Sequence, residues 1–434
     1  MSYIVFKTKY SEGLEQPAFV PSGTYSVSEE GTYNITNYEF IRVLVETEGL
    51  KKIVCSTDTT WVLKNDGTLW GCGSNAYGQQ GSDDTNDVPI FTQRLTKVLD
   101  VACSANTTWV IKKDGTLWGC GLNNYGQQGN GTQNNVTEFT QRMTGVSIVR
   151  CSNQTTWVLK NDGTLWGCGW NINGQQGSGN TNDVTTFTQR MSDVKRIYVY
   201  NRVTWALKND DTLWGCGWNE YGQQSAGNTT NVLTFTQRIN NVKEVGCANY
   251  TTWVLKNDGT LWGCGYNNYG QQGSGDTTDV LTLTQRMSNV KNFSSKSDAV
   301  WVVKEDGTLW GCGDGYGGQQ GNSGSSSVAV LTQRLANVKQ AFGEGDNITW
   351  ALKNDNALWG CGWNLNGQQG SGSTAEVTEF TQRMSDVKEF VNSAYTTWVI
   401  KNDGTLYGCG QNNHGQQGAG NTTDILTFTQ RLGD

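Results

Sequence analysis

The chain has 434 residues, among them 55 glycines, 18 tryptophans, 3 prolines and a single histidine, and its net charge at pH 7 is −7. The acidic balance disfavours a nucleic-acid partner or an anionic membrane surface, because both require a basic protein surface. No stretch is long and apolar enough to insert into a bilayer. Short apolar runs between Gly, Asn and Asp, without extended helical periodicity, predict an all-β protein.

Residues 1–48 differ in kind from the rest of the chain. Ile41, Val43 and Val45 alternate as a strand would, which predicts a small N-terminal β segment. The phrase PSGTYSVSEEGTYNITNYEFIRVLVETEG (21–49) resembles a phrase found in tail-associated proteins of bacteriophages from Gram-positive hosts. The resemblance implies that this segment tethers the chain to other proteins of a phage or tail-like particle. The alternative is an ordinary N-terminal strand that caps the next domain.

The N-terminus MSYIVFKTKYSEG has no secretory apolar region and no cleavage site. We therefore expect a protein made in the cytoplasm without a signal peptide. Together with the phage-like phrase, this leads us to expect assembly on a virion or a phage-tail-like particle.

Residues 49–434 repeat one short unit. The phrase DGTLWGCG begins at Asp66, Asp114, Asp162, Asp258 and Asp306, and its variants DDTLWGCG, DNALWGCG and DGTLYGCG begin at Asp210, Asp355 and Asp403. The eight instances follow one another at steps of 48 residues, with one step of 49. One unit contains four short β-like segments: KEVGCA (243–248), TTWVLKN (251–257), TLWGCG (260–265) and VLTLTQR (280–286). Four strands at this period predict a β-propeller of eight four-stranded blades. The alternative is a seven-bladed ring with an extra partial blade.

The phrases DGTLWGCGLNNYGQQGNGT (114–132) and NVKEVGCANYTTWVLKNDGTLWGCGYNNYGQQGSGDT (241–277) resemble the repeat of the regulator of chromosome condensation family. The resemblance covers about residues 49–434 and implies a propeller, usually of seven blades. Eight complete units favour a closed eight-bladed ring in which blade 1 abuts blade 8. The family includes a nucleotide-exchange factor and an enzyme inhibitor, so the resemblance does not fix a function.

The repeated phrase predicts how neighbouring blades pack. We expect the Trp of LWGCG to fill the space between sheets, and Gly-Cys-Gly to let backbones approach closely. Of the 12 cysteines, eight lie in this phrase. Residues that recur once per unit are usually too far apart to bridge, so we expect small, buried, reduced thiols. Disulfides within four of the units are the alternative, and the absence of a CxxC pair disfavours zinc.

The sequence offers few residues that could form a catalytic site. His414 is the only histidine and stands where other units have Tyr or Asn, so we interpret it as a loop residue. No phosphate-binding loop is present. Carboxylates gather only in loops, at Asp83, Asp84 and Asp87 and again at Asp276 and Asp279; we interpret them as turn residues, with Ca²⁺ binding as the alternative. We predict a protein that is not an enzyme and that needs no cofactor and no metal.

Positions that vary within the constant frame are candidates for recognition. The residue after Gly-Cys-Gly and the residue three positions later vary between units, at the start of a long polar loop. Aromatic side chains there can stack on sugar rings or anchor a protein partner. The candidate binding residues are Trp170, Trp218, Tyr266, Trp363, Tyr77, Tyr125, Tyr221, Tyr269 and His414. The alternative is that these aromatics wedge between adjacent blades. The invariant Gln pairs are expected to satisfy loop backbone groups.

These observations lead to one functional hypothesis and two alternatives. We predict a non-enzymatic recognition protein of a phage or phage-tail-like particle, which binds a host surface protein or glycan through a propeller rim. The first alternative is an intracellular protein-interaction scaffold or enzyme inhibitor on the same fold. The second is a glycan-acting enzyme, which the lack of an evident acid pair disfavours.

Overall fold

The computed structural model describes residues 49–432 apart from 105, 153, 201, 248–249, 297, 343–346 and 394. The chain divides after Gly49, and the second unit runs over Leu50–Asp434. The β segment predicted for residues 1–48 lies outside the described residues. No helix among the described residues is long and apolar enough to cross a membrane.

The described chain consists of 32 strands and one short 3₁₀ helix, η1 (Tyr316–Gly318). The first strands of the blades are β1 (Leu50–Cys55), β5 (Val98–Ser104), β9 (Val146–Ser152), β13 (Val194–Tyr200), β17 (Val242–Cys247), β21 (Val290–Lys296), β25 (Val338–Phe342) and β29 (Val387–Asn392). The second strands are β2 (Thr59–Lys64), β6 (Thr107–Lys112), β10 (Thr155–Lys160), β14 (Val203–Lys208), β18 (Thr251–Lys256), β22 (Ala299–Lys304), β26 (Ile348–Lys353) and β30 (Thr396–Lys401).

The third strands are β3 (Leu69–Gly73), β7 (Leu117–Gly121), β11 (Leu165–Gly169), β15 (Leu213–Gly217), β19 (Leu261–Gly265), β23 (Leu309–Gly313), β27 (Leu358–Gly362) and β31 (Leu406–Gly410). The fourth strands are β4 (Val88–Leu95), β8 (Val136–Met143), β12 (Val184–Met191), β16 (Val232–Ile239), β20 (Val280–Met287), β24 (Val328–Leu335), β28 (Val377–Met384) and β32 (Ile425–Leu432).

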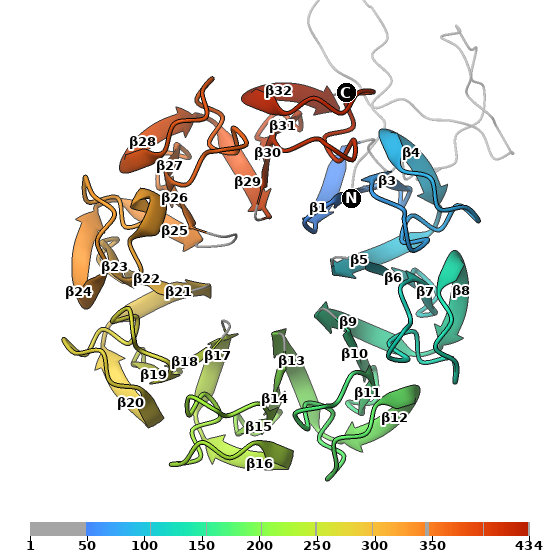
Figure 1. Cartoon of the computed structure of the whole chain (residues 1–434), viewed down its shortest axis with the longest axis horizontal. Coiled ribbons are helices and arrows are strands. Elements are labelled where there is room, and N and C mark those ends of the chain that lie inside the picture. Colours follow the sequence, from blue (N-terminus) through green and yellow to red (C-terminus); the bar gives the residue numbers. More distant parts are fainter. Residues whose placement is uncertain are drawn as a thin grey trace, which may run out of the picture. The chain divides into compact units, whose positions relative to one another are not determined.

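Each blade is an antiparallel sheet of four consecutive strands, and the eight blades form a ring (Figure 1). The first strand of each blade lies nearest the centre and the fourth lies at the outer wall. The prediction of an all-β propeller with eight four-stranded blades is confirmed, and the seven-bladed alternative is wrong.

The Asp-Gly-Thr turn between the second and third strands explains the start of the repeated phrase. In blade 1, Asp66 Oδ1 accepts hydrogen bonds from the backbone N–H of Thr68 at 2.7 Å and from its hydroxyl at 2.8 Å. The Thr68 oxygen in turn accepts from the indole N–H of Trp70 at 3.0 Å. Gly67 takes a φ of +88°, which favours glycine. The turn thus needs an Asp followed by a residue tolerant of positive φ, and seven of the eight blades add the Thr, which Ala357 replaces in blade 7.

The boundaries between blades, here called seams, are filled mainly by the tryptophans of the second strands. Trp61 is fully buried and packs with Leu63 and Leu69 against Val98 and Val101 of the next blade. The Trp of LWGCG, which we expected to fill this space, is only half-buried and packs at the edge of the seam, as Trp118 does. The expected wedge therefore belongs chiefly to the second strand.

The two glycines of Gly-Cys-Gly serve different close approaches. A Cβ on Gly71 would lie 2.6 Å from Cζ3 of Trp61, so this glycine makes room for the indole of its own blade. Gly73 has a φ of +106°, and a Cβ there would lie 2.1 Å from the carbonyl oxygen of Asp58. We expected both glycines to allow a neighbouring backbone to approach closely. Only Gly73 does so, whereas Gly71 accommodates a side chain.

The ring closes by direct contact between blades 8 and 1. The N–H of Gly420 donates to the carbonyl of Pro89 at 3.0 Å, as Gly131 does to Thr185 between blades 2 and 3 at 2.9 Å. Cys72 Sγ donates to the carbonyl of Gln416 at 3.3 Å. No strand is exchanged between the two blades, because each sheet contains only consecutive strands. The predicted abutment is confirmed.

The thiols are part of this packing. The eight cysteines of the repeated phrase form no disulfide, as we predicted. The eight of the repeated phrase are buried, and Cys55, Cys103, Cys151 and Cys247 are half-buried. Burial raises the pKa of Cys264 to about 12, so this thiol stays protonated at neutral pH. Such buried thiols act as small apolar side chains.

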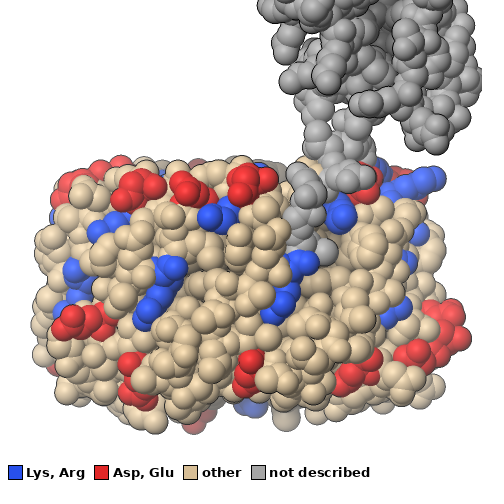
Figure 2. All heavy atoms as spheres, turned by 90° about the horizontal axis from the view of Figure 1, so that it is seen from above, with Lys and Arg blue, Asp and Glu red and all other residues tan. Residues whose placement is uncertain are grey.

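The outer wall carries both signs of charge. On the side shown in Figure 2, acidic side chains gather along the two margins, and Lys and Arg are spaced between them. The arginines of the repeated TQR phrase are half-buried at the wall, and burial lowers the pKa of Arg94. The wall is therefore a mixed surface without one extended patch of a single sign on the side shown.

Candidate binding face

One face of the ring gathers the positions that vary between blades. In each blade the end of the third strand pairs with the start of the second strand; in blade 4, Gly217 pairs with Val203. The Asp-Gly-Thr turns lie at the opposite end of these two strands. The residue after Gly-Cys-Gly bonds to the residue just before the second strand, as Trp218 N does to the Arg202 carbonyl at 2.9 Å. We call the surface formed by these two positions and the following long loops the loop face.

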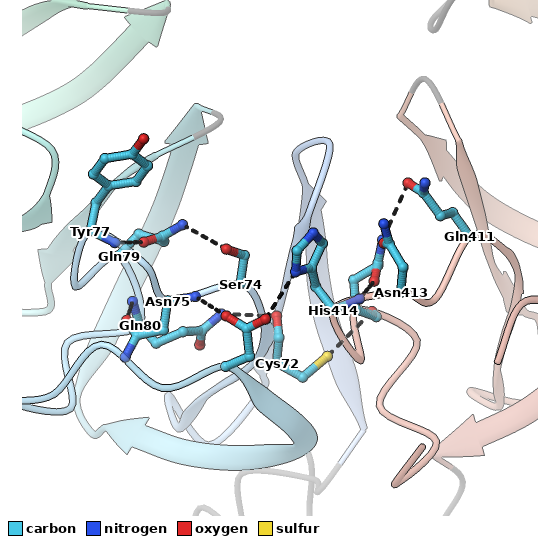
Figure 3. A network of polar contacts seen from close by, with 11 residues as sticks. Cys72, Ser74, Asn75, Tyr77, Gln79, Gln80, Gln411, Asn413 and His414 are labelled. Atoms are coloured by element: carbon cyan, nitrogen blue, oxygen red, sulfur yellow. Dashed lines mark hydrogen bonds and ion pairs between the residues drawn. The ribbon is translucent and has the colours of Figure 1, made fainter. Parts of the chain in front are cut away.

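Buried amides hold each loop in place. In blade 1, Gln80 Nε2 donates to the Cys72 carbonyl at 2.9 Å, and Gln79 Oε1 accepts from the Tyr77 N–H at 2.9 Å (Figure 3). Asn75 Oδ1 accepts from the Gln80 N–H at 2.8 Å. The prediction that the Gln pairs satisfy loop backbone groups is confirmed.

The loop carboxylates cap turns. Asp84 Oδ1 accepts from the Asn75 amide at 3.0 Å and from the Asn86 N–H at 2.9 Å. Other blades place Asn at the same position; Asn180 Oδ1 accepts from the Asn182 N–H at 3.0 Å. Because the neutral amide of Asn180 accepts the same backbone hydrogen bond as the carboxylate of Asp84, we interpret these carboxylates as structural. Among the described residues, no group of three or more His, Cys, Asp or Glu could hold a metal ion.

The largest feature of the loop face is a run of aromatic rings across blades 2 to 5, here called the aromatic arc. Trp218 contacts Tyr250 at a centroid distance of 5.2 Å, and Tyr250 contacts Tyr266 at 5.6 Å. The rings meet mostly edge to face, which is the favourable geometry for aromatic pairs. The members of the arc are Tyr125, Trp170, Trp218, Tyr221, Tyr250, Tyr266 and Tyr269.

Arg202 connects two parts of the arc that have no ring–ring contact with each other: the pair Tyr125 and Trp170, and the group that begins at Trp218. Its guanidinium carbon lies 4.8 Å from the centroid of the Trp170 ring and 5.2 Å from that of Trp218. The cation is thus stacked against two indoles from adjacent blades, an arrangement that is favourable for arginine. The arc and Arg202 together form a continuous surface over seams 2–3, 3–4 and 4–5.

Six of the nine predicted binding residues belong to the arc, namely Tyr125, Trp170, Trp218, Tyr221, Tyr266 and Tyr269. The arc rings are half-buried or exposed, whereas the seam tryptophans are fully buried. Trp218 and Trp363 do also pack against the seam cores, so the wedge alternative describes part of their surface. The binding role of all nine stays a prediction.

The other three predicted residues lie elsewhere on the loop face. Tyr77 is exposed in blade 1, and Trp363 contacts Tyr395 at a centroid distance of 6.4 Å. His414 Nδ1 lies 2.9 Å from Asp87 Oδ2, across the seam between blades 8 and 1 (Figure 3). His414 is therefore a seam residue of the loop face.

The sequence analysis missed Arg202 and Tyr250. Both occupy the position just before the second strand, which varies between units as much as the two positions that were examined. Its occupants are Asp58, Asn106, Gln154, Arg202, Tyr250, Asp298, Asn347 and Tyr395. The same criterion of variability within a constant frame would have identified them.

Blade 6 gives the loop face an acidic end. Burial, and next the neighbouring carboxyl of Asp314, raises the pKa of Asp298 to about 6. The same two carboxylates raise the pKa of Tyr269 at the end of the arc. The loop of blade 6 also differs in shape, because Gly315 replaces the usual Asn and η1 follows. The loop face is thus aromatic in blades 2 to 5 and acidic in blade 6.

Comparisons with known proteins identify the fold. A model described as the regulator of chromosome condensation (RCC1) repeat matches residues 50–79 and 98–127, and a second model with that description matches residues 66–111. Residues 50–127, which form blade 1 and the first strands of blade 2, thus match RCC1-type repeats. No curated protein matches the sequence.

Solved structures agree with this assignment. Human WBSCR16 matches with a TM-score of 0.56 and 19% identity, over 68% of this chain and 84% of that chain. Prp20p from Saccharomyces cerevisiae matches at 0.56 and 14%, over 77% and 86%. Yeast RCC1 (Prp20), in a structure with Kap60, matches at 0.58 and 13%, over 86% and 94%. Identities this low establish the fold and leave the function open.

Proposed function

We propose that this propeller is a non-enzymatic recognition protein that binds its partner through the aromatic arc. The observation that carries the proposal is the arc itself, in which Trp, Tyr and Arg side chains from four blades form one surface. These are the residue types that dominate binding hot spots. The RCC1-type fold, which suggests protein interaction, supports a binding role.

The finer proposal names the setting. The partner is a host surface protein or glycan, and the chain is a component of a phage or phage-tail-like particle. Support for this comes from the phage-like phrase in residues 21–49. In this proposal residues 1–48 attach the propeller to other particle proteins, and the loop face points to the host.

Binding to whole cells and to fractionated envelopes of candidate hosts tests the proposal. The fluorescently labelled full chain should bind, and the double variant Trp170→Ala/Trp218→Ala should lose at least about tenfold in affinity, since two central anchors are removed. The matched control is Trp363→Ala, which removes a loop-face tryptophan outside the arc. It should bind as the parent does.

Two results would contradict the proposal. If the parent chain binds no candidate cell or envelope fraction but captures one stoichiometric soluble partner from host lysate, the intracellular scaffold would replace it. If the double variant and the Trp363→Ala control bind cells as well as the parent, the arc is not the binding surface.

A further inference from the structure

The seam between blades 3 and 4 collects hydrogen-bond donors that have no acceptor. Gln175 is fully buried, and its side-chain Nε2 has no partner among the described residues. Its backbone carbonyl accepts from the Thr204 hydroxyl at 2.9 Å, which places Gln175 beside the segment that carries Arg202. A buried amide N–H₂ without an acceptor is costly, so this seam is unfavourable as it stands.

The same amide finds an acceptor at some other seams, whereas Gln223 at seam 4–5 and Gln368 at seam 7–8, which face Tyr250 and Tyr395, also lack a partner among the described residues. At seam 5–6, Gln271 Nε2 donates to Asp298 Oδ1 at 3.2 Å, and at seam 6–7, Gln319 Nε2 donates to Asn347 Oδ1 at 3.0 Å. In blade 1, Gln79 Nε2 instead reaches the Ser74 hydroxyl at 3.4 Å (Figure 3). Asp298 and Asn347 occupy the position just before the second strand of the next blade.

At seam 3–4 that position is Arg202. The acceptors Asp298 and Asn347 of seams 5–6 and 6–7 are thus replaced by a guanidinium, which can only donate hydrogen bonds. None of the ion pairs within the described residues involves Arg202, and the nearby carboxylate of Glu220 accepts from the indole N–H of Trp218 at 3.2 Å. The seam therefore presents a stacked guanidinium and a buried amide, both lacking an acceptor.

We propose that seam 3–4 binds the anionic group of an acidic saccharide, with Arg202 and Gln175 as donors to its carboxylate or phosphate oxygens. This inference rests on the proposed function, because it names the ligand of the same arc. A planar guanidinium fits a carboxylate or a phosphate through two parallel hydrogen bonds. Beyond the two indoles stacked on Arg202, Tyr125 lies beside Trp170 and Tyr250 lies beside Trp218, so aromatic rings that can contact sugar rings flank the charge on both sides.

A saccharide fits better than an acidic protein segment. The arc continues on both sides of Arg202 over several blades, which suits a chain of repeated rings flanking the charged unit. An acidic peptide would bring several carboxylates close to Asp298, Asp314 and Glu220, and these would repel it.

The test uses the full chain on an array that holds carboxylated, phosphorylated and neutral saccharides, together with poly-L-glutamate. We expect binding to acidic saccharides, and the array distinguishes carboxylate from phosphate as the anion. If the carboxylated members bind, calorimetry compares an oligosaccharide that carries a single uronate unit with its neutral methyl ester. If the phosphorylated members bind, calorimetry compares a matched phosphorylated and dephosphorylated saccharide. Removing the charge from the saccharide should weaken binding at least about tenfold.

The variant Arg202→Asp recreates the arrangement of seam 5–6 and gives Gln175 an acceptor. It should fold at least as stably as the parent by thermal unfolding, and lose acidic-saccharide binding at least about tenfold. Lys208→Gln is the matched control, because Lys208 lies at the far end of strand β14, which begins just after Arg202, and its Nζ lies 5.3 Å from the Trp214 ring centroid. It removes one stacked cation and should leave binding unchanged.

Several outcomes would overturn the inference: no binding to any acidic saccharide, equal binding to the neutral saccharides, preferred binding of poly-L-glutamate, or undiminished binding by Arg202→Asp. The failure of this inference differs from the failure of the proposed function. If Trp170→Ala/Trp218→Ala abolishes cell binding and Arg202→Asp does not, the arc is a recognition surface whose ligand is not held through an anion.

Discussion

The seams and the loop face of this ring obey different constraints. At every seam a fully buried tryptophan of the second strand packs against the next blade, and the same residue types return in all eight units. On the loop face the position before the second strand holds Asp, Asn, Gln, Arg or Tyr. Each of the eight seams must be filled by side chains of similar size and shape, whereas a residue on the loop face is not constrained by close packing. Identity between blades therefore marks structure, and variation marks the candidate for recognition.

The largest expected effect of a substitution is at a seam. Trp157→Ala should destabilise the ring by about 3–5 kcal/mol, because it deletes a fully buried indole from the core between blades 3 and 4. Trp170→Ala, on the loop face of the same blade, should cost about 1 kcal/mol through lost ring and cation contacts. Urea unfolding measures both. Similar costs for the two variants would remove the distinction between seam and loop face.

A pair of glycines sharpens the comparison at smaller cost. A Cβ on Gly167 would lie 2.5 Å from Gln176 Oε1 and 2.8 Å from Trp157 Cζ3, so Gly167→Ala should destabilise by about 1–3 kcal/mol. Gly324, in the loop of blade 6, has no atom within 4 Å of the added Cβ, and Gly324→Ala should be nearly neutral. Thermal unfolding of the two variants compares them directly. A neutral Gly167→Ala would show that the seam can relax around the third strand.

The smallest expected effect depends on pH and concerns the acidic end of the loop face. The pKa of Asp298, about 6, lies above its ordinary value of 3.8, so the folded state favours the protonated carboxyl. Its contribution to stability is fully present below about pH 4 and is lost as the pH rises through 6. Asp298→Asn should therefore stabilise the chain at pH 7.5 by about 1–2 kcal/mol, after allowance for solvent screening, and have little effect at pH 4.

Urea unfolding at the two pH values measures this difference. The Asn keeps an acceptor for Gln271, so the hydrogen bond at seam 5–6 survives the substitution. An equal gain at pH 4 and pH 7.5 would contradict the assigned cause, since a neutral side chain would then be favoured for reasons other than charge.

The sequence predicts the fold well because a repeat gives eight independent copies of one pattern. The expected strand 251–257 is β18 (Thr251–Lys256), and the expected strand 280–286 is β20 (Val280–Met287). The eightfold count and the abutting closure follow from eight complete units. The burial of each tryptophan does not follow, because Trp61 and Trp70 alternate along a similar pattern and only the packed seam makes one interior and the other half-exposed.

The candidate site is predictable only in part. The loop positions of Trp170, Trp218 and Tyr266 stand out in the sequence because they vary within a fixed frame. Their contact with one another does not, since neighbours on the loop face are about one repeat apart along the chain. The donors at seam 3–4 are harder still to predict. The Gln at the position of Gln175 is identical in every unit. Its amide is unpaired at Gln175, where Arg202 stands in the next blade, and also at Gln223 and Gln368, where Tyr250 and Tyr395 stand.

The closure between blades 8 and 1 bears on how such a protein can change over evolutionary time. The last link of the ring uses the same thiol, carbonyl and glycine contacts as a link inside the chain. Among the described residues of the ring, the packing distinguishes no blade as the first or the last. A gene whose propeller began at another blade boundary would therefore encode the same ring. Circular permutation and the exchange of whole blades can then occur during evolution without disrupting the ring. Each exchanged blade would bring its own loop-face residues with it.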